Sequence, residues 1–144
     1  MQRPAAGALF SIVMLLPPLS AAWAFDLMIK VSGATPEIGQ IIVSVFDSEE
    51  AYMKEPYRED IAPVDQTGMS SVLFEGLSAQ DYAVSLIYDA DADGELDTNI
   101  FGVPTEAFGF SNGAKAFFGP PGWKAAAFAL NADLTIEIKL EIAD

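Results

Sequence analysis

The chain has 144 residues, a formal net charge of −14, and neither cysteine nor histidine. This length predicts one domain, and an apolar content of 51% is enough for a core without covalent cross-links. The missing residue types exclude disulfides, thiol catalysis, nitrogen- or thiolate-ligated zinc and copper sites, and Ser-His-Asp hydrolases. The acidic balance also argues against nucleic acid as a partner, because phosphate binding depends on Lys and Arg.

The N-terminus has the pattern of an export signal. Arg3 precedes an apolar run over residues 8–16, and Ala22-Trp23-Ala24 offers a small-x-small cleavage site. The run is too short to span a bilayer. We therefore expect residues 1–24 to be a signal peptide and residues 25–144 to be a periplasmic or secreted domain, with no membrane span after cleavage.

Apolar residues at period two predict strands along the rest of the chain. Residues 25–32 alternate in this way, and residues 41–46 are apolar on both faces except at Ser44, as expected of a central strand. Residues 54–67 are polar and contain proline, which predicts a long surface loop. The remaining predicted strands are residues 69–75, 82–88, 125–130 and 134–142. Short strands with regular turns predict an all-β sandwich.

Residues 89–97 concentrate acidic side chains at two-residue spacing. The carboxylates belong to Asp89, Asp91, Asp93, Glu95 and Asp97. They repel one another unless a hard cation, which prefers oxygen ligands, neutralises them. Their order matches the first nine positions of an EF-hand loop, with Gly94 at the sharp turn and the Glu95 carbonyl at position seven. We predict that these five residues bind Ca²⁺.

The acidic loop departs from an EF-hand after its ninth position. Position twelve is Ile100, where a bidentate glutamate is needed, and no helical pattern flanks the loop. Asn99 and Glu106 are the nearest further oxygen donors. A hairpin turn at Asp93-Gly94 with solvated acidic neighbours is the alternative interpretation. We favour calcium because a plain turn does not require carboxylates at alternate positions.

Several motifs together resemble one protein family. They are Val45-Phe46-Asp47-Ser48-Glu49-Glu50, Phe74-Glu75-Gly76-Leu77, Tyr82-Ala83-Val84, the acidic loop, Phe101 to Asn112, and Gly119-Pro120-Pro121. In this order they resemble DUF2141, a family of exported bacterial proteins. The resemblance implies a single immunoglobulin-like or transthyretin-like antiparallel β-sandwich of about seven strands, and it supplies no reaction.

This chain departs from the family pattern at two places. Members commonly carry histidine just before the first loop aspartate, where this chain has Tyr88. They also commonly carry a Pro-Gly pair before the tyrosine strand, where this chain has Ser78-Ala79-Gln80-Asp81. A histidine contribution to metal binding is therefore excluded here.

Residues 101–123 are rich in aromatic rings and glycine. The rings belong to Phe101, Phe108, Phe110, Phe117, Phe118 and Trp123. One interpretation is a recognition platform for a protein or glycan partner. The other is core packing, which we favour because large aromatic side chains are usually buried. The exposure of the rings distinguishes the two.

The sequence favours a non-catalytic module with Ca²⁺ as its cofactor, acting in binding or in a structural role. One alternative is a carboxylate-based, glycan-active enzyme that pairs Glu106 with a loop aspartate as acid and base. A second alternative is a plain structural domain without a metal. Carboxylates in an acidic loop are more often metal ligands or solvated turn residues than catalysts, which places calcium first.

Overall fold

Side chains of alternating burial divide each strand into an inner and an outer face. In β1 (Ala24–Ser32), Leu27, Ile29 and Val31 are buried, whereas the residues between them are more exposed. Strand β4 (Met69–Ser78) follows the same period. Because successive strand side chains point to opposite faces, each strand presents one apolar face to a common core.

The computed structural model describes residues 22–102 and 104–141. The other strands are β2 (Gln40–Phe46), β3 (Arg58–Pro63), β5 (Gln80–Asp89), β6 (Phe108–Phe110), β7 (Phe128–Leu130) and β8 (Leu134–Lys139). A 3₁₀ turn, η1 (Ser111–Gly113), and a single helical turn, α1 (Trp123–Ala126), separate β6 from β7. Within the described ranges, no helix has the length and apolar character needed to cross a membrane.

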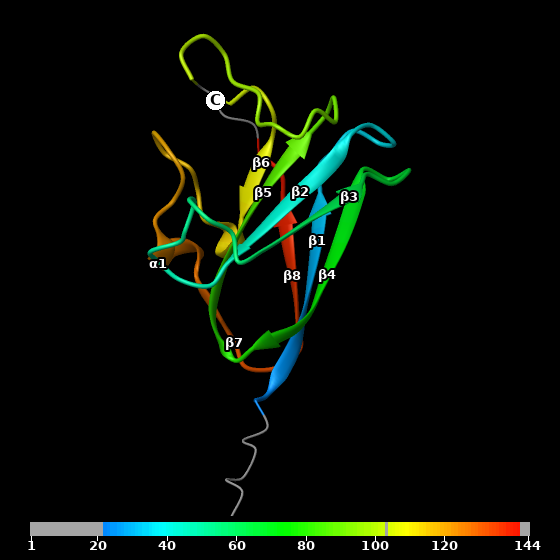
Figure 1. Cartoon of the computed structure of the whole chain (residues 1–144). Coiled ribbons are helices and arrows are strands. Elements are labelled where there is room, and N and C mark those ends of the chain that lie inside the picture. Colours follow the sequence, from blue (N-terminus) through cyan, green and yellow to red (C-terminus); the bar gives the residue numbers. More distant parts are fainter. Residues whose placement is uncertain (1–21, 103, 142–144) are drawn as a thin grey trace, which may run out of the picture.

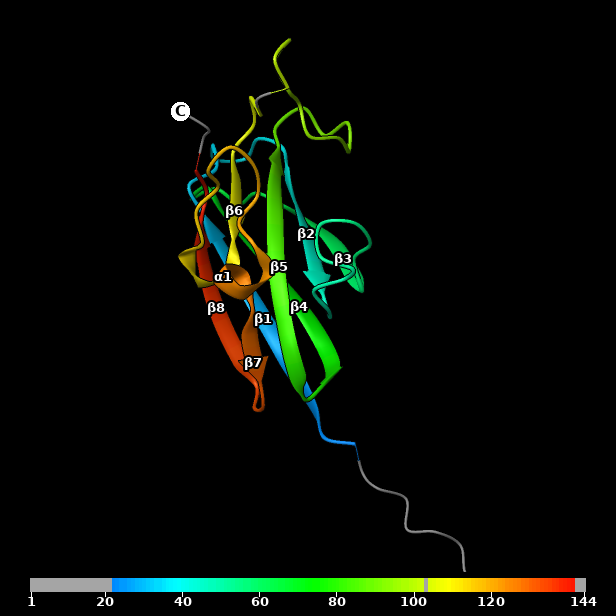
Figure 2. The ribbon, with the colours of Figure 1, turned by 90° about the vertical axis from the view of Figure 1, so that its left-hand side faces the viewer.

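The strands form two sheets packed face to face (Figures 1 and 2). One sheet has the order β4-β1-β8, and the other has the order β3-β2-β5-β6, with β7 pairing to the first residues of β5. These pairs are antiparallel except for β1 with β8, which is parallel. The predicted all-β sandwich is confirmed, with eight strands in the described residues and one parallel pair.

The core lies between the two sheets. Its fully buried side chains include Leu27 and Ile29 from one sheet and Ile41, Val43 and Leu86 from the other. Burial of a Leu, Ile or Val side chain stabilises the folded state by about 1.5–3 kcal/mol. A smaller cluster around Tyr52 packs outside this core, with Phe46, Ala83 and Ala126. The buried faces of the predicted strands therefore meet as the sequence pattern indicates.

The predicted surface loop over residues 54–67 is partly wrong, because β3 lies within it. Strand β3 is almost wholly exposed; only Ala62 is half-buried. It forms by pairing with β2, and Ser44 Oγ donates a hydrogen bond to Glu59 Oε2 at 2.6 Å. An exposed edge strand has no buried face, so it shows no hydrophobic alternation in the sequence.

The predicted strand over residues 125–130 is also partly wrong. Ala125 and Ala126 belong to the helical turn α1, and the strand is confined to β7. The sequence there is alanine-rich, and alanine favours helix over strand. The predicted strand over residues 134–142 is observed as β8, which ends earlier, at Lys139; Ile142 lies outside the described residues.

The predicted signal peptide lies outside the described residues except for Ala22, Trp23 and Ala24. Every described strand lies at or after Ala24, so a chain that begins at Phe25 keeps the whole sandwich apart from one terminal strand residue. In Figure 1 the chain enters β1 at the lower end of the sandwich, and the acidic loop projects from the opposite end.

Candidate metal site

Strand β5 ends at Asp89, the first residue of the acidic loop. In the β2–β5 pairing Asp89 lies opposite Gln40, whose amide donates a hydrogen bond to Asp89 Oδ2 at 2.7 Å. Asp89 is completely buried, at 0% exposure. A buried carboxylate is costly unless hydrogen-bond donors surround it. The conformation at the end of β5 therefore depends on the groups that donate hydrogen bonds to the Asp89 carboxylate.

Two backbone N–H groups of the loop complete the donor set of Asp89. Asp93 N donates to Oδ1 at 3.1 Å, and Gly94 N donates to Oδ2 at 2.9 Å. Burial raises the pKa of Asp89, but the hydrogen bonds from Gln40, Gly94 and Asp93 outweigh burial and lower the pKa below its ordinary value. The loop thus folds around a charged carboxylate.

Glu106 joins the two ends of the loop from a later position in the chain. Its Oε1 accepts a hydrogen bond from Ala90 N at 2.8 Å, and its Oε2 accepts one from Asp97 N at 3.1 Å. Glu106 is buried, at 8% exposure. Thr105 N also donates to the Asp97 carbonyl at 2.9 Å. The segment before β6 therefore closes the loop opposite Asp89.

In the described part of the chain, one group of metal-ligating side chains comes together: Asp89, Asp91 and Glu106. One carboxylate oxygen from each lies within 4.8 Å of the others. Two oxygens on opposite sides of a Ca²⁺ ion, each at about 2.4 Å, are about 4.8 Å apart. The spacing therefore fits ligands of a single ion. Asp91 is exposed, so solvent reaches this group.

The charge of the loop is concentrated and unfavourable. Burial and the neighbouring carboxylates raise the pKa of Asp91 and that of Asp97. Neighbouring negative charges disfavour the ionised form, which is the direction of both shifts. The ion pair found among the described residues lies elsewhere, between Lys115 and Glu141. A bound cation is the natural means of offsetting this repulsion.

The other predicted ligands, Asp93, Glu95 and Asp97, lie outside the group of three carboxylates. Asp93 Oδ1 accepts a hydrogen bond from Glu95 N at 2.8 Å, which shapes the turn. The backbone N–H of Asp97 donates a hydrogen bond to Glu106, one of the two further oxygen ligands considered from the sequence. Asn99 is the other further oxygen ligand considered from the sequence, and its Oδ1 accepts a hydrogen bond from Phe101 N at 2.9 Å.

The turn before β2 supports the acidic loop, a role that the sequence did not predict. Gly39 has a φ of 71°, and a Cβ there would lie 2.4 Å from the Asp89 carbonyl oxygen and 2.8 Å from Ala90 Cα. Tyr88 Oη donates to the Ile38 carbonyl at 3.0 Å. These contacts join segments far apart in the chain, so no local pattern around Gln40 could have revealed them.

The family comparison agrees with the motifs. A comparison with protein-family models matches residues 29–137 to "Uncharacterized protein conserved in bacteria (DUF2141)". The chain belongs to the DUF2141 family. The family membership that the motifs of this DUF2141 domain indicate is therefore confirmed. Comparison with curated proteins finds no match, and comparison with solved structures finds none either.

The aromatic segment of this DUF2141 domain is divided between core and surface. The predicted packing is correct for Phe110, which is buried, and partly for Phe108 and Trp123, which are half-buried. It is wrong for three rings, whose exposures are 83% for Phe101, 82% for Phe117 and 100% for Phe118. The exposed rings lie in loops, outside the strands.

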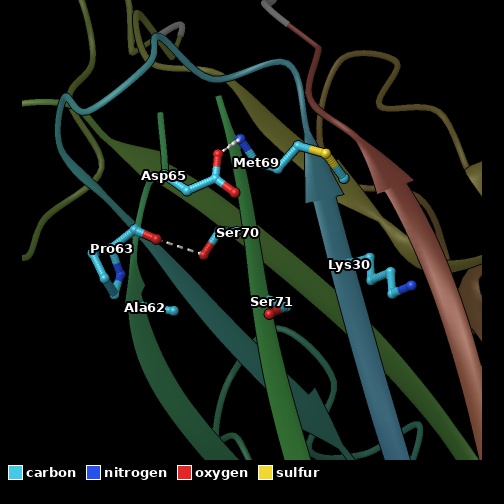
Figure 3. A pocket seen from close by; sticks show the side chains of 7 residues that line it. All are labelled: Lys30, Ala62, Pro63, Asp65, Met69, Ser70 and Ser71. Atoms are coloured by element: carbon cyan, nitrogen blue, oxygen red, sulfur yellow. Dashed lines mark hydrogen bonds between the residues drawn. The ribbon is translucent and has the colours of Figure 1, made fainter. Parts of the chain in front are cut away.

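A shallow cleft opens where β3 approaches β4 (Figure 3). Ser70 Oγ donates to the Pro63 carbonyl at 3.0 Å, and Met69 N donates to Asp65 Oδ1 at 3.0 Å. The side chain of Lys30 points away from Asp65 in this view. These polar groups hold the turn between the two strands, and the cleft gathers none of the predicted metal ligands.

Proposed function

We propose that this DUF2141 domain is an exported, non-catalytic binding module whose acidic loop binds Ca²⁺. The observation that carries the calcium proposal is the convergence of Asp89, Asp91 and Glu106 on one another, with no salt bridge to any of them among the described residues. Oxygen ligands alone favour calcium over softer ions. Asp93, Asp97 and the Glu95 carbonyl, together with water, would complete the coordination.

Calcium acts on the module through linkage between binding and folding. The ion binds the folded loop and scarcely the unfolded chain, because only folding brings Glu106 to Asp89. At one hundred times the dissociation constant this adds about 2.7 kcal/mol to the free energy of unfolding. A site shared with water falls in the weak extracellular class, at about 10⁻⁴ to 10⁻³ M. The bound ion also orders the segment after the loop.

The non-catalytic part of the proposal rests on the state of the carboxylates. An acid and a base for glycan cleavage must reach a substrate. Both oxygens of Glu106 accept backbone hydrogen bonds, and Asp89 is fully buried. Such groups support the loop better than they serve proton transfer. Export is proposed from the N-terminal sequence pattern alone.

The decisive experiment is thermal unfolding of residues 25–144 in excess EDTA and then with increasing Ca²⁺, with Mg²⁺ at equal concentrations as the control. We expect a calcium-selective rise in the melting temperature. Magnesium demands a tighter octahedral shell and keeps its waters, so its effect should be small. An unchanged melting temperature would favour the metal-free structural domain and overturn the calcium proposal.

A substitution assigns the effect to the loop. Asp91→Asn removes an exposed ligand charge, and we expect it to abolish most of the calcium-dependent rise while the metal-free protein stays folded. Asp81→Asn, an exposed aspartate on β5 outside the loop, makes the same charge change and should keep the full calcium response. A full response in Asp91→Asn would place the ion elsewhere.

A further inference from the structure

Two loops expose large apolar side chains that the fold leaves uncovered. The first tip is Ile100 and Phe101, at 93% and 83% exposure, and the second tip is Phe117 and Phe118, at 82% and 100%. The rings of the second tip lie edge to face, with centroids 4.7 Å apart. Adjacent, almost fully exposed apolar residues at a loop tip mark an interaction site.

The backbone of the second tip strengthens this interpretation. Phe118 has a φ of 53°, a left-handed conformation that a bulky residue rarely adopts. Glycine or asparagine would fit this position without strain. The chain instead keeps a fully exposed phenylalanine there, so neither backbone geometry nor burial explains the ring.

The second tip belongs to a long stretch of the chain that has no acidic residue. Residues 107–132 contain no aspartate or glutamate and include Lys115 and Lys124, in a chain with a net charge of −14. Both lysines are exposed; Lys115 pairs with Glu141 at the surface, where ion pairs remain solvated and weak. The charge around the second tip is therefore less negative than that of the rest of the chain.

Both tips lie toward the same end of the sandwich. In Figure 1 the yellow-green loop after β5 and the gold loop between η1 and α1 both project toward the upper left. Figure 2, turned by 90°, again shows the gold loop rising to the level where β5 ends and the yellow-green loop extending beyond it. The loops that carry the two tips therefore lie toward the same end of the molecule.

We propose that the two tips dock onto a lipid bilayer, with the four apolar side chains in the interfacial layer and the two lysines near anionic headgroups. Aromatic rings and lysines are the residues that anchor proteins at this depth. This inference names the partner of the binding role proposed above, and it does not depend on calcium.

The shape of the site favours a bilayer over a protein or a glycan. A specific protein partner needs about 800 Å² of matched surface on each side, whereas two separate convex tips offer small contacts that a deformable bilayer accepts without a matching shape. A glycan needs convergent hydrogen-bonding groups. Residues 116–122 read Ala-Phe-Phe-Gly-Pro-Pro-Gly and carry no such side chain.

The overall negative charge limits how the domain approaches a membrane. At physiological ionic strength the Debye length is about 8 Å, so charges far from the contact are screened. Lys115 and Lys124 lie close in sequence to the second tip, whereas Asp97 lies three residues before the first tip. Because Asp97 opposes the two lysines, phosphatidylglycerol should strengthen binding only slightly, and the rings should contribute most of the affinity. We therefore expect added salt to weaken vesicle binding only in part.

The test is co-sedimentation of residues 25–144 with vesicles in EDTA, using phosphatidylcholine alone and a phosphatidylcholine–phosphatidylglycerol mixture. We expect binding to the mixture and weaker binding to phosphatidylcholine. Phe117→Ser with Phe118→Asn should reduce the affinity by at least about tenfold, since two rings leave the lipid. Ile61→Ser removes a half-exposed apolar residue on β3 and should bind as the wild type does.

A fluorescent reporter checks the depth of the tip. Phe118→Trp in a Trp123→Phe background places the single tryptophan of residues 25–144 at the tip, and its emission should shift to shorter wavelength on vesicles. No binding to either vesicle, or unchanged binding of the Phe117/Phe118 variant, would overturn the proposal and leave a protein or glycan partner. In a parallel assay with Ca²⁺ in place of EDTA, binding that appears only with Ca²⁺ and survives this variant would also overturn it, by assigning the contact to the acidic loop. Since the assay contains EDTA, its failure leaves the calcium proposal untouched.

Discussion

At the residue scale, Asp97 carries a charge that the folded loop disfavours. Burial and the carboxylates of Asp91 and Glu106 raise its pKa. In EDTA at neutral pH, Asp97→Asn should therefore raise the melting temperature by removing repulsion. In saturating Ca²⁺ the same substitution should lower it, because a ligand is lost. Thermal unfolding in the two buffers measures both signs, and equal shifts in both would contradict a role in metal binding.

Gly39 is the residue through which the turn before β2 holds the acidic loop. Its left-handed φ of 71° and the 2.4 Å approach to the Asp89 carbonyl leave no room for a Cβ. We expect Gly39→Ala to destabilise the protein by about 2–4 kcal/mol, from backbone strain and displacement of the loop. Urea unfolding measures this loss. Gly76→Ala is the control, because Gly76 also has a positive φ but no neighbour within 4 Å, so this variant measures the cost of backbone strain alone.

At the element scale, Asp65 holds the turn between β3 and β4. Its carboxylate accepts hydrogen bonds from the Thr67 hydroxyl, the Thr67 N–H and the Met69 N–H, and these lower its pKa below the ordinary value of 3.8. A carboxylate with a lowered folded pKa stabilises the protein above its unfolded pKa, and this stability is lost as pH falls through the folded value.

The turn therefore predicts a pH-dependent effect of Asp65→Asn. The variant should be less stable than the wild type at neutral pH, and the difference should shrink as pH falls below 3.8. Urea unfolding of both proteins over a pH series measures the difference. A gap that stays constant down to the lowest pH would mean that the carboxylate charge is not what holds the turn.

At the scale of the whole molecule, the net charge of −14 opposes the compact state. In EDTA we expect the melting temperature to rise as ionic strength increases from about 0.01 M to about 1 M, where the Debye length falls from about 30 Å to about 3 Å. Saturating Ca²⁺ should reduce this salt effect because it neutralises the densest charge. A salt effect of equal size with and without Ca²⁺ would mean that the repulsion does not originate in the acidic loop.

Periodicity in the sequence identified most of the sandwich. Alternation at residues 25–32 and the apolar run at residues 41–46 correspond to β1 and β2, because burial of one or both strand faces leaves a pattern in the chain. Strand β3 left no such pattern, since its pairing with β2 uses backbone groups that every residue carries. The family and the acidic loop also followed from local motifs.

The sequence by itself determined the composition, the all-β class, the family and the spacing of the loop carboxylates, because these depend on residues near one another in the chain. Only the tertiary structure decided that Glu106 and Gln40 meet Asp89, and that Phe110 is buried while Phe118 is exposed. Contacts between distant segments depend on strand register and on how the sheets pack, and neither leaves a signal in local spacing.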